Sequence, residues 1–271
     1  MISIANKTKR YYDDHGWKVD GKYTKDAIYW EDLRENAYDY IRKCRRRILR
    51  HIPPEGDKIL DMGSGPIQYS DYLLYSRGFR RRICIDLSFN ALKAARMKIG
   101  NHGIYINANF LDIPLKKNYF DCAISLHALY HFPKDRQEEA VRKLIYVTKP
   151  CMPIIIVYSN PNTILSNIKP YIYNEKFIKM NNIIQTRQRN SLSEIYFYRF
   201  PVEWWKRFNS YADVKIYPWR SFKSVDQKIL IPDNRLGKLM LSSLFVLEEL
   251  FPSSFVKHFQ YPLIVLTKHR Y

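Results

Sequence analysis

Between residues 58 and 158 the sequence alternates short β-rich runs with segments of helical pattern. The β-rich runs are KILDMG, RRICIDLS, GIYINANF, FDCAISL and PIIIVYS. Strands separated by helices predict a parallel sheet with right-handed crossovers, and nearly continuous apolar runs such as PIIIVY are typical of strands covered on both faces. The sequence therefore predicts a doubly wound α/β fold.

The regions on either side of this alternation differ from it. Residues 161–200 are rich in Asn, Lys, Tyr and Arg and show no strand alternation, which predicts an inserted cap or lid. ADVKIYPW and YPLIVLTKH then predict two further strands, with a helix over GKLMLSSLFVLEELF between them. The expected organisation is an N-terminal helical cap (1–50), a core (51–160), the inserted cap or lid (161–200) and the last two strands and helix of a seven-stranded, mostly parallel sheet (201–271).

The chain is strongly basic, with 45 Lys and Arg against 26 Asp and Glu and a net charge of +19. Such a charge favours nucleic acid, anionic membrane surfaces or phosphorylated substrates, although compositional drift explains it equally well. The densest run, RKCRRRILRH, carries apolar residues at helical spacing. It predicts an amphipathic helix with a solvated basic face.

The cysteines and the hydropathy of the chain indicate the cellular compartment in which the protein would be found. The four cysteines are widely spaced without a CxxC pair, so neither a zinc site nor a disulfide framework is indicated. The N-terminus MISIANKTKRYY becomes charged before an apolar run develops, unlike a signal peptide. The apolar stretch from Leu239 to Leu247 is far shorter than the roughly 20 residues of a spanning helix. We expect a soluble, cytoplasmic protein.

The stretch KILDMGSGPIQYSDYL predicts a strand, a glycine turn and a helix that together cradle a nucleotide. Gly63 and Gly65 begin a dinucleotide fingerprint, but the third glycine is missing. Asp86 closes the next strand about 20 residues later, where a carboxylate can accept both ribose hydroxyls. Asp61 would repel a pyrophosphate and suits a ligand with a cationic ammonium group.

These features together resemble the class I S-adenosylmethionine-dependent methyltransferases, especially the group that methylates small molecules. The resemblance covers most of residues 58–158, with five motif blocks in order. They are LDMGSG, CIDLS, ANFLDIPLKKNYFD, AISLHALYHF and LIYVTKPCMPIIIVYS. The resemblance implies a Rossmann-like sheet and S-adenosylmethionine as the cofactor, with S-adenosylhomocysteine as its product.

The resemblance also implies residue roles. The methionine part of the cofactor would contact the glycine turn and Asp61, and the ribose would bind Asp86. The adenine would contact three further residues, and the sulfonium would lie above a floor at the end of the fourth strand. The residues implied for the methionine part are Gly63, Ser64 and Gly65 with Asp61, and the residue for the ribose is Asp86. Those implied for the adenine are Leu87, Asn109 and the Phe110 backbone, and those for the floor are Ser125 and Leu126. Ile67 and Asn109 depart from the family pattern, in which Gly and Asp are frequent.

Two histidines follow the fourth predicted strand. His127 is the best candidate for a general base, with a positioning or structural role as the alternative. His131 lies one helical turn later and is a second catalytic candidate. The H-x-x-x-H spacing resembles a metal motif but lacks the glutamate of a zincin and a third ligand, so we expect no metal.

Aromatic segments at two places supply candidates for the acceptor pocket. In the N-terminal cap they are Tyr11 and Tyr12, with Tyr23 and Arg34 as further candidates for closing the site. After the insertion, EIYFYRFPVEWWKRF offers Tyr198 and Trp204, with Tyr196 and Trp205 beside them. The alternative for both segments is packing for stability.

Three functions remain open at this point. The first is methylation of an oxygen or nitrogen on a small metabolite, such as a sugar or a lipid-linked intermediate. The second is nucleic-acid methylation, favoured by the charge, although the chain reads SLHA where an N-P-P-Y tetrapeptide would stand. The third is a non-catalytic basic interaction protein, in which the segment from Lys238 to Phe259 contacts a membrane surface or forms a core helix.

Overall fold

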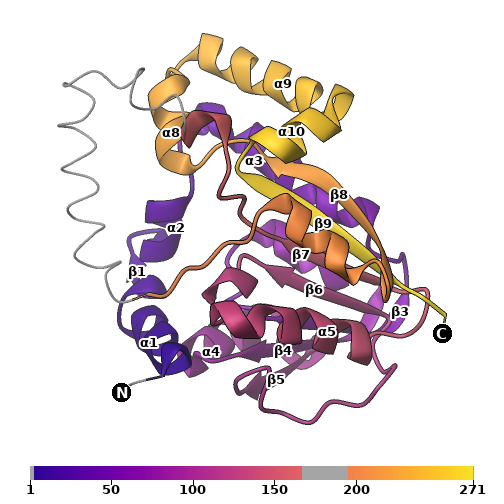
Figure 1. Cartoon of the computed structure of the whole chain (residues 1–271). Helices are drawn as coiled ribbons and strands as arrows, with labels where there is room; N and C mark the ends of the chain where they lie inside the picture. The colour runs from indigo at the N-terminus through magenta and orange to yellow at the C-terminus, as the bar shows by residue number, and fades with distance from the viewer. Residues whose placement is uncertain (1–2, 167–194, 271) are drawn as a thin grey trace.

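The computed structural model describes residues 3–166 and 195–270 and is built around a seven-stranded sheet (Figure 1). The sheet order is β5-β4-β3-β6-β7-β9-β8. Within this sheet β9 alone runs opposite to the other six strands, which confirms the doubly wound, mostly parallel sheet that the sequence predicts. The strands are β3 (Gly56–Met62), β4 (Phe79–Asp86), β5 (Gly103–Asn107), β6 (Cys122–Leu126), β7 (Pro153–Val157), β8 (Ala212–Arg220) and β9 (Tyr261–Lys268).

Apolar clusters cover both faces of this sheet. Successive strand residues point to opposite faces, so Leu60 belongs to one cluster and Ile59 to the other. The first cluster includes α5 (Gln137–Val147) and the 3₁₀ segment η8 (Val202–Phe208). The second includes α4 (Phe89–Ile99) and the 3₁₀ segments η3 (Arg47–Arg50) and η4 (Ser70–Ser76).

Local signals set the ends of α4 as predicted. The Ser88 side chain accepts a hydrogen bond from the Ala91 amide at 3.0 Å, and Gly100 caps the C-terminus with φ +50°. The segment after β3 differs from the prediction. Ile67 adopts φ +50° in the turn, and the chain continues into the 3₁₀ segment η4 instead of an α-helix.

The densest basic run forms α3 (Tyr38–Arg46) and continues into η3, but the prediction of a solvated basic face is wrong in part. Arg45 and Arg47 are buried. Arg45 pairs with Glu31 at 2.7 Å, and Arg47 pairs with Glu248 at 2.8 Å. Glu31 lies 14 positions before Arg45 and Glu248 lies 201 positions after Arg47, so the run supplies structural ion pairs as well as surface charge.

Helices and short elements flank the sheet at both ends of the chain. The N-terminal elements are α1 (Ile4–Tyr11), the π-helical η1 (Tyr12–Gly16), the hairpin β1 (Val19–Asp20) and β2 (Tyr23–Thr24), α2 (Lys25–Trp30) and η2 (Glu35–Ala37). The remaining 3₁₀ turns are η5 (Gly100–His102), η6 (Leu129–His131) and η7 (Lys134–Arg136). Where the sequence predicts one C-terminal helix there are α8 (Ser224–Leu230), α9 (Arg235–Leu250) and α10 (Pro252–His258).

Two further observations delimit the fold. Most of the predicted insertion at 161–200 lies outside the described residues. Within the described ranges, no single helix is both long enough and apolar enough to cross a bilayer.

Candidate active site

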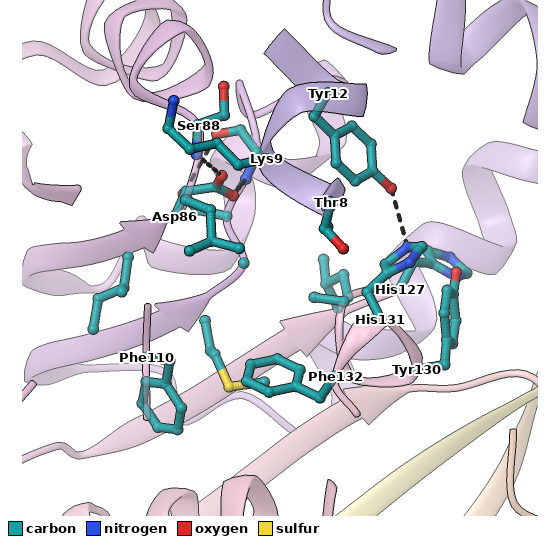
Figure 2. Close-up of a pocket in the computed structure, with 18 of the residues that line it drawn as sticks. Thr8, Lys9, Tyr12, Asp86, Ser88, Phe110, His127, Tyr130, His131 and Phe132 are labelled. Atoms are coloured by element: carbon teal, nitrogen blue, oxygen red, sulfur yellow. Dashed lines mark hydrogen bonds between the residues drawn. The ribbon is translucent and has the colours of Figure 1, made fainter. Parts of the chain in front are cut away.

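A cavity of about 830 Å³ opens where the parallel strands end. Its walls include the turns that follow β3, β4 and β6, and the N-terminal elements α1 and α2 cover the same end of the sheet (Figure 1). The carboxyl ends of strands in an open α/β sheet are the usual place for a ligand. Figure 2 shows Asp86 and Ser88 on one side of this cavity and the two histidines on the other.

The glycine turn after β3 forms a tight cradle. Gly63 and Gly65 have φ values of +68° and +56°, which residues with a Cβ adopt at a cost. A Cβ on Gly63 would lie 2.4 Å from Cβ of Ala128, and one on Gly65 would lie 3.2 Å from the Trp17 ring. Ser64 between them also lines the cavity. The backbone can therefore approach a ligand closely only because both positions are glycine.

Asp86 closes this cradle at the end of β4. Its Oδ2 accepts the amide of Gly65 at 2.8 Å, and its Oδ1 accepts the amide of Ser88 at 2.8 Å. Burial raises the pKa of the carboxyl to about 6. Each carboxylate oxygen retains acceptor capacity, so the group can still receive hydrogen bonds from a pair of ligand hydroxyls.

Asp61 is paired with an arginine that the sequence analysis missed. Arg82 is fully buried and donates from Nε at 3.0 Å and from Nη2 at 2.5 Å, both to Oδ2 of Asp61. Burial raises the pKa of the Asp61 carboxyl, and the guanidinium opposes this shift. Because Arg82 compensates the charge, the argument that Asp61 repels a pyrophosphate is weaker than the sequence suggests. Oδ1 accepts no hydrogen bond from the described residues and remains available.

The residues expected around the adenine lie at the cavity, and the side chain of one of them is already hydrogen-bonded to its neighbours. Leu87, Asn109 and Phe110 all line it. The Asn109 amide is engaged locally, since Oδ1 accepts the Leu111 amide at 3.3 Å and Nδ2 donates to Asp112 at 2.8 Å. Its oxygen keeps one lone pair for a ligand.

The two residues expected as a floor at the end of β6 lie in different places. Leu126 lines the cavity, whereas Ser125 does not and is fully buried. Ser125 lies within the strand, between β3 and β7 in the sheet, and its side chain points to the face opposite that of Leu126.

The N-terminal elements cover the cradle from outside. Trp17 packs against Gly65, and Tyr12 stacks on Trp17 with ring centroids 4.7 Å apart. Asp13 pairs with Lys9 at 2.9 Å and accepts a hydrogen bond from the Ser88 hydroxyl. The cover is therefore connected to the same turn that Asp86 organises.

His131 has both ring nitrogens in hydrogen bonds. Nδ1 lies 3.0 Å from the carbonyl oxygen of Tyr196, which can only accept, so Nδ1 carries the proton. Nε2 lies 3.1 Å from the Tyr12 hydroxyl and, in the neutral ring, accepts its proton (Figure 2). Burial lowers the pKa of His131 to about 4, so this neutral tautomer prevails near neutrality. His131 thus connects Tyr12 of the N-terminal elements to the backbone of Tyr196 through hydrogen bonds.

His127 faces the other half of the cavity in an unusual backbone conformation, with φ +60°. Its ring lies 4.7 Å from that of Trp219 and 5.3 Å from that of Tyr261, measured between centroids. Its side chain makes no hydrogen bond within the described part of the chain. Burial, aided by the charge of Arg220, lowers its pKa to about 3. At neutral pH the His127 ring is therefore neutral, with one N–H donor and one acceptor nitrogen.

The aromatic residues predicted for the acceptor pocket are only partly at the cavity. Tyr12 lines it, whereas Tyr11, Tyr198 and Trp204 do not. Tyr11 is buried within the cover, and the Trp204 ring stacks on Phe200 at 4.5 Å. The further candidates also lie elsewhere: Tyr23 is exposed on the hairpin, and Arg34 pairs with Asp32.

The segment after the insertion lines the cavity with the residues that alternate with the predicted ones. Phe197 and Arg199 line the cavity instead of Tyr196 and Tyr198. The amide of Tyr198 donates to the carbonyl of Tyr130 at 2.9 Å, which fixes this register. The sequence indicates alternation in this segment but not which set of residues faces the cavity.

Asp26 is another residue that the sequence analysis missed. It lines the cavity, and burial raises the pKa of its carboxyl to about 7. Trp17 and Trp30 from the same N-terminal region also form cavity walls. A carboxylate inside the aromatic stretch KDAIYW is the only signal that could have pointed to it.

Comparisons with known proteins concern the fold and the central part of the chain. A family model described as a methyltransferase domain matches residues 60–152. No curated protein matches the sequence significantly. Geranyl diphosphate C-methyltransferase from Streptomyces coelicolor is similar in structure with a TM-score of 0.56 at 14% identity, covering 98% of each chain.

Two other solved structures show the same likeness. A SAM-dependent methyltransferase from Archaeoglobus fulgidus has a TM-score of 0.53 at 17% identity, covering 85% of this chain and 94% of that one. Phosphoethanolamine N-methyltransferase 2 from Haemonchus contortus, in complex with S-adenosyl-L-methionine, has a TM-score of 0.54 at 14% identity, and the match covers 99% of this chain but 60% of that one. At these identities the structural likenesses establish the fold alone. The chain has the fold of the class I S-adenosylmethionine-dependent methyltransferases, and its residues 60–152 match the methyltransferase domain.

Proposed function

We propose that this enzyme transfers a methyl group to an oxygen or nitrogen of a small acceptor, such as a sugar or a lipid-linked intermediate. The observation that carries the proposal is a single cavity of about 830 Å³ with two unlike halves. One half is the glycine cradle with Asp86, and the other is an aromatic chamber with His127. Asp26 also lines the cavity. Pockets for small ligands typically measure about 300–1,000 Å³.

The cradle suits S-adenosylmethionine. We assign the ribose to Asp86, the methionine part to Gly63 to Gly65 and Oδ1 of Asp61, and the adenine to Leu87, Asn109 and Phe110. When bound, the cofactor supplies a methyl group activated by its sulfonium. Nε1 of Trp17 is buried beside Gly65 and has no hydrogen-bond partner among the described residues, so it offers a donor to the same ligand.

The aromatic half would orient the acceptor and exclude water. Its walls include Phe197, Tyr130, Trp219 and Tyr261. Methyl transfer by displacement depends mainly on alignment, which rigid rings provide. The neutral ring of His127 would accept a hydrogen bond from the acceptor on its free nitrogen and take its proton. Asp26, whose pKa of about 7 makes it the stronger base, is the second candidate for that role.

Two observations bear on the alternatives. Arg45 and Arg47 of the densest basic run are buried in ion pairs, which leaves less of that run exposed for contact with nucleic acid, while the net charge of +19 is unchanged. The four cysteines are unpaired, three of them buried, which supports the cytoplasm as the proposed location.

An acceptor screen tests the proposed reaction. The full chain is incubated with S-adenosylmethionine and pools of small hydroxyl and amine compounds, and formation of S-adenosylhomocysteine is measured. We expect turnover with a small acceptor and none with RNA. Turnover with RNA alone would contradict the proposal.

His127→Asn tests the role of the histidine. Asparagine tolerates the left-handed backbone better than alanine, so the loop is preserved while the imidazole is removed. If His127 is the base, kcat falls about 10²-fold or more while cofactor affinity changes little. Steady-state kinetics and calorimetry measure the two quantities. An unchanged kcat would leave the histidine with a packing role only.

Trp17→Ala tests the cover. Removing the indole from above Gly65 exposes the cradle, and we expect cofactor affinity to fall about tenfold through lost aromatic contact. Trp30→Ala is the matched control, because Trp30 also lines the cavity but does not contact Gly65. Equal losses in both variants would indicate a general loosening of the N-terminal elements.

A further inference from the structure

The helix α9 presents a long apolar face to solvent. Its residues recur at i, i+3 and i+4, and among them Leu239 is 63% and Leu250 is 64% exposed. Phe251 extends the face at 57% exposed. Figure 1 shows α9 on the outside of the fold, away from the sheet. Sixteen residues make a stripe about 24 Å long. The helix residues of this face are Leu236, Leu239, Met240, Val246, Leu247 and Leu250.

The other side of α9 is firmly docked, so the exposed face does not result from a loosely placed helix. Leu241 packs with Tyr40, Ile41 and Cys44 in a buried cluster. Glu248 is fully buried, receives Arg47 at 2.8 Å and accepts the Tyr40 hydroxyl at 2.7 Å. Pulling the helix away would leave buried charges unpaired, which is costly.

Basic side chains border the apolar face on the flank next to α3. Arg235 is exposed at the start of α9, and Lys238 lies 3.2 Å from Asp39. Lys43 from α3 lies with its Nζ 5.4 Å from the ring centroid of Phe245. Of the acidic groups near this flank, Asp39 and Glu249 are paired with lysine or arginine, whereas Asp233, just before α9, is exposed and makes no ion pair with the described residues; the chain as a whole carries a charge of +19. The surroundings of the face are therefore suited to an anionic surface.

We propose that α9 is a docking surface for an anionic lipid bilayer, with the helix lying in the plane of the interface. A leucine-rich face bordered by Lys and Arg is the pattern of interfacial helices, and basic side chains near anionic lipid add attraction. By length and composition, α9 and α10 together are apolar enough to be considered for a span, but they are bent by 106°. The buried pair of Glu248 and Arg47 also holds α9 on the protein, which favours lying on the membrane over crossing it.

Vesicle co-sedimentation of the full chain tests the apolar face. We expect binding to vesicles of phosphatidylcholine mixed with phosphatidylserine, weaker binding to pure phosphatidylcholine, and release at high salt. Leu239→Glu combined with Leu250→Glu should lower the apparent constant for binding to vesicles about tenfold or more. Met97→Glu is the control, because Met97 is an 83% exposed residue on α4 and its replacement should change nothing.

A second pair of variants tests the basic border. Lys43→Glu combined with Lys238→Glu should weaken binding to the anionic vesicles and leave binding to pure phosphatidylcholine unchanged. Lys93→Glu is the matched control, since Lys93 also lies over an exposed aromatic ring, that of Phe89, but on α4.

Other results would overturn the proposal. One is vesicle binding that the α9 variants do not affect. Another is self-association in sedimentation velocity that the α9 variants abolish without any vesicle binding, which would identify a second copy of the chain as the occupant. Circular dichroism melting and calorimetry with S-adenosylmethionine establish that each variant is folded. The test requires no methyl transfer, so its outcome is independent of the proposed reaction.

Discussion

Replacing Asp86 by alanine is expected to reduce S-adenosylmethionine affinity by about 10²-fold or more. Two hydrogen bonds from ribose hydroxyls to a carboxylate contribute about 1.5–3 kcal/mol each. The same change removes the acceptor that holds the amides of Gly65 and Ser88, each at 2.8 Å. Isothermal calorimetry measures the affinity. Asp213→Ala on β8 is the control, because that carboxylate is exposed and remote from the cavity.

The pH dependence of binding separates ligand contact from loop support. Burial raises the pKa of Asp86 to about 6, and ribose hydroxyls donate to the ionised form. Affinity should therefore be constant above pH 7 and fall towards tenfold per unit below pH 6, as the carboxyl takes up a proton. The alanine variant should lose this dependence. Wild-type affinity that is flat from pH 5 to 8, or tight binding by the alanine variant, would contradict the assignment.

Arg82→Met is expected to lower the free energy of unfolding by about 3–5 kcal/mol, because it leaves Asp61 buried without its counter-charge. Arg82 and Asp61 are both almost completely buried, and Arg82 also donates to the Tyr72 carbonyl at 2.6 Å. Urea denaturation followed by circular dichroism measures the change. Arg80→Met is the matched control on the same strand, since the Arg80 pair with Asp57 is exposed and its loss should have little effect.

The double variant Asp61→Asn with Arg82→Met distinguishes stability from binding. With neither charge left unpaired, it should be more stable than Arg82→Met alone. If Oδ1 of Asp61 orients the cofactor, affinity for S-adenosylmethionine should stay low despite the recovered stability. Recovery of both stability and affinity would restrict Asp61 to a structural role.

The sequence predicts those parts of the fold that depend on neighbours along the chain. All seven strands fall on the predicted runs, because apolar β-rich stretches are local signals. Ser88 and Gly100 set the ends of α4 for the same reason. Gly63, Gly65 and Asp86 meet at the cavity because two successive parallel strands end there.

The remaining features depend on residues far apart in the sequence. Arg82 and Arg47 read as surface charge until Asp61 and Glu248 are known to lie beside them. Similarly, Phe197 faces the cavity because a backbone hydrogen bond to Tyr130 sets the register of its segment, and a shift of one residue would exchange the two faces.

The pair of Arg47 and Glu248 has a consequence for how the chain is made. These residues are 201 positions apart, so Arg47 is synthesised long before its partner. Until α9 leaves the ribosome, the Arg47 guanidinium lacks its partner and stays in contact with water. During that time α3 cannot complete its packing. Contacts of such separation close late and slow the folding of a chain. The packing of α3 against α9 can thus be completed only after residue 248 of 271 has been synthesised.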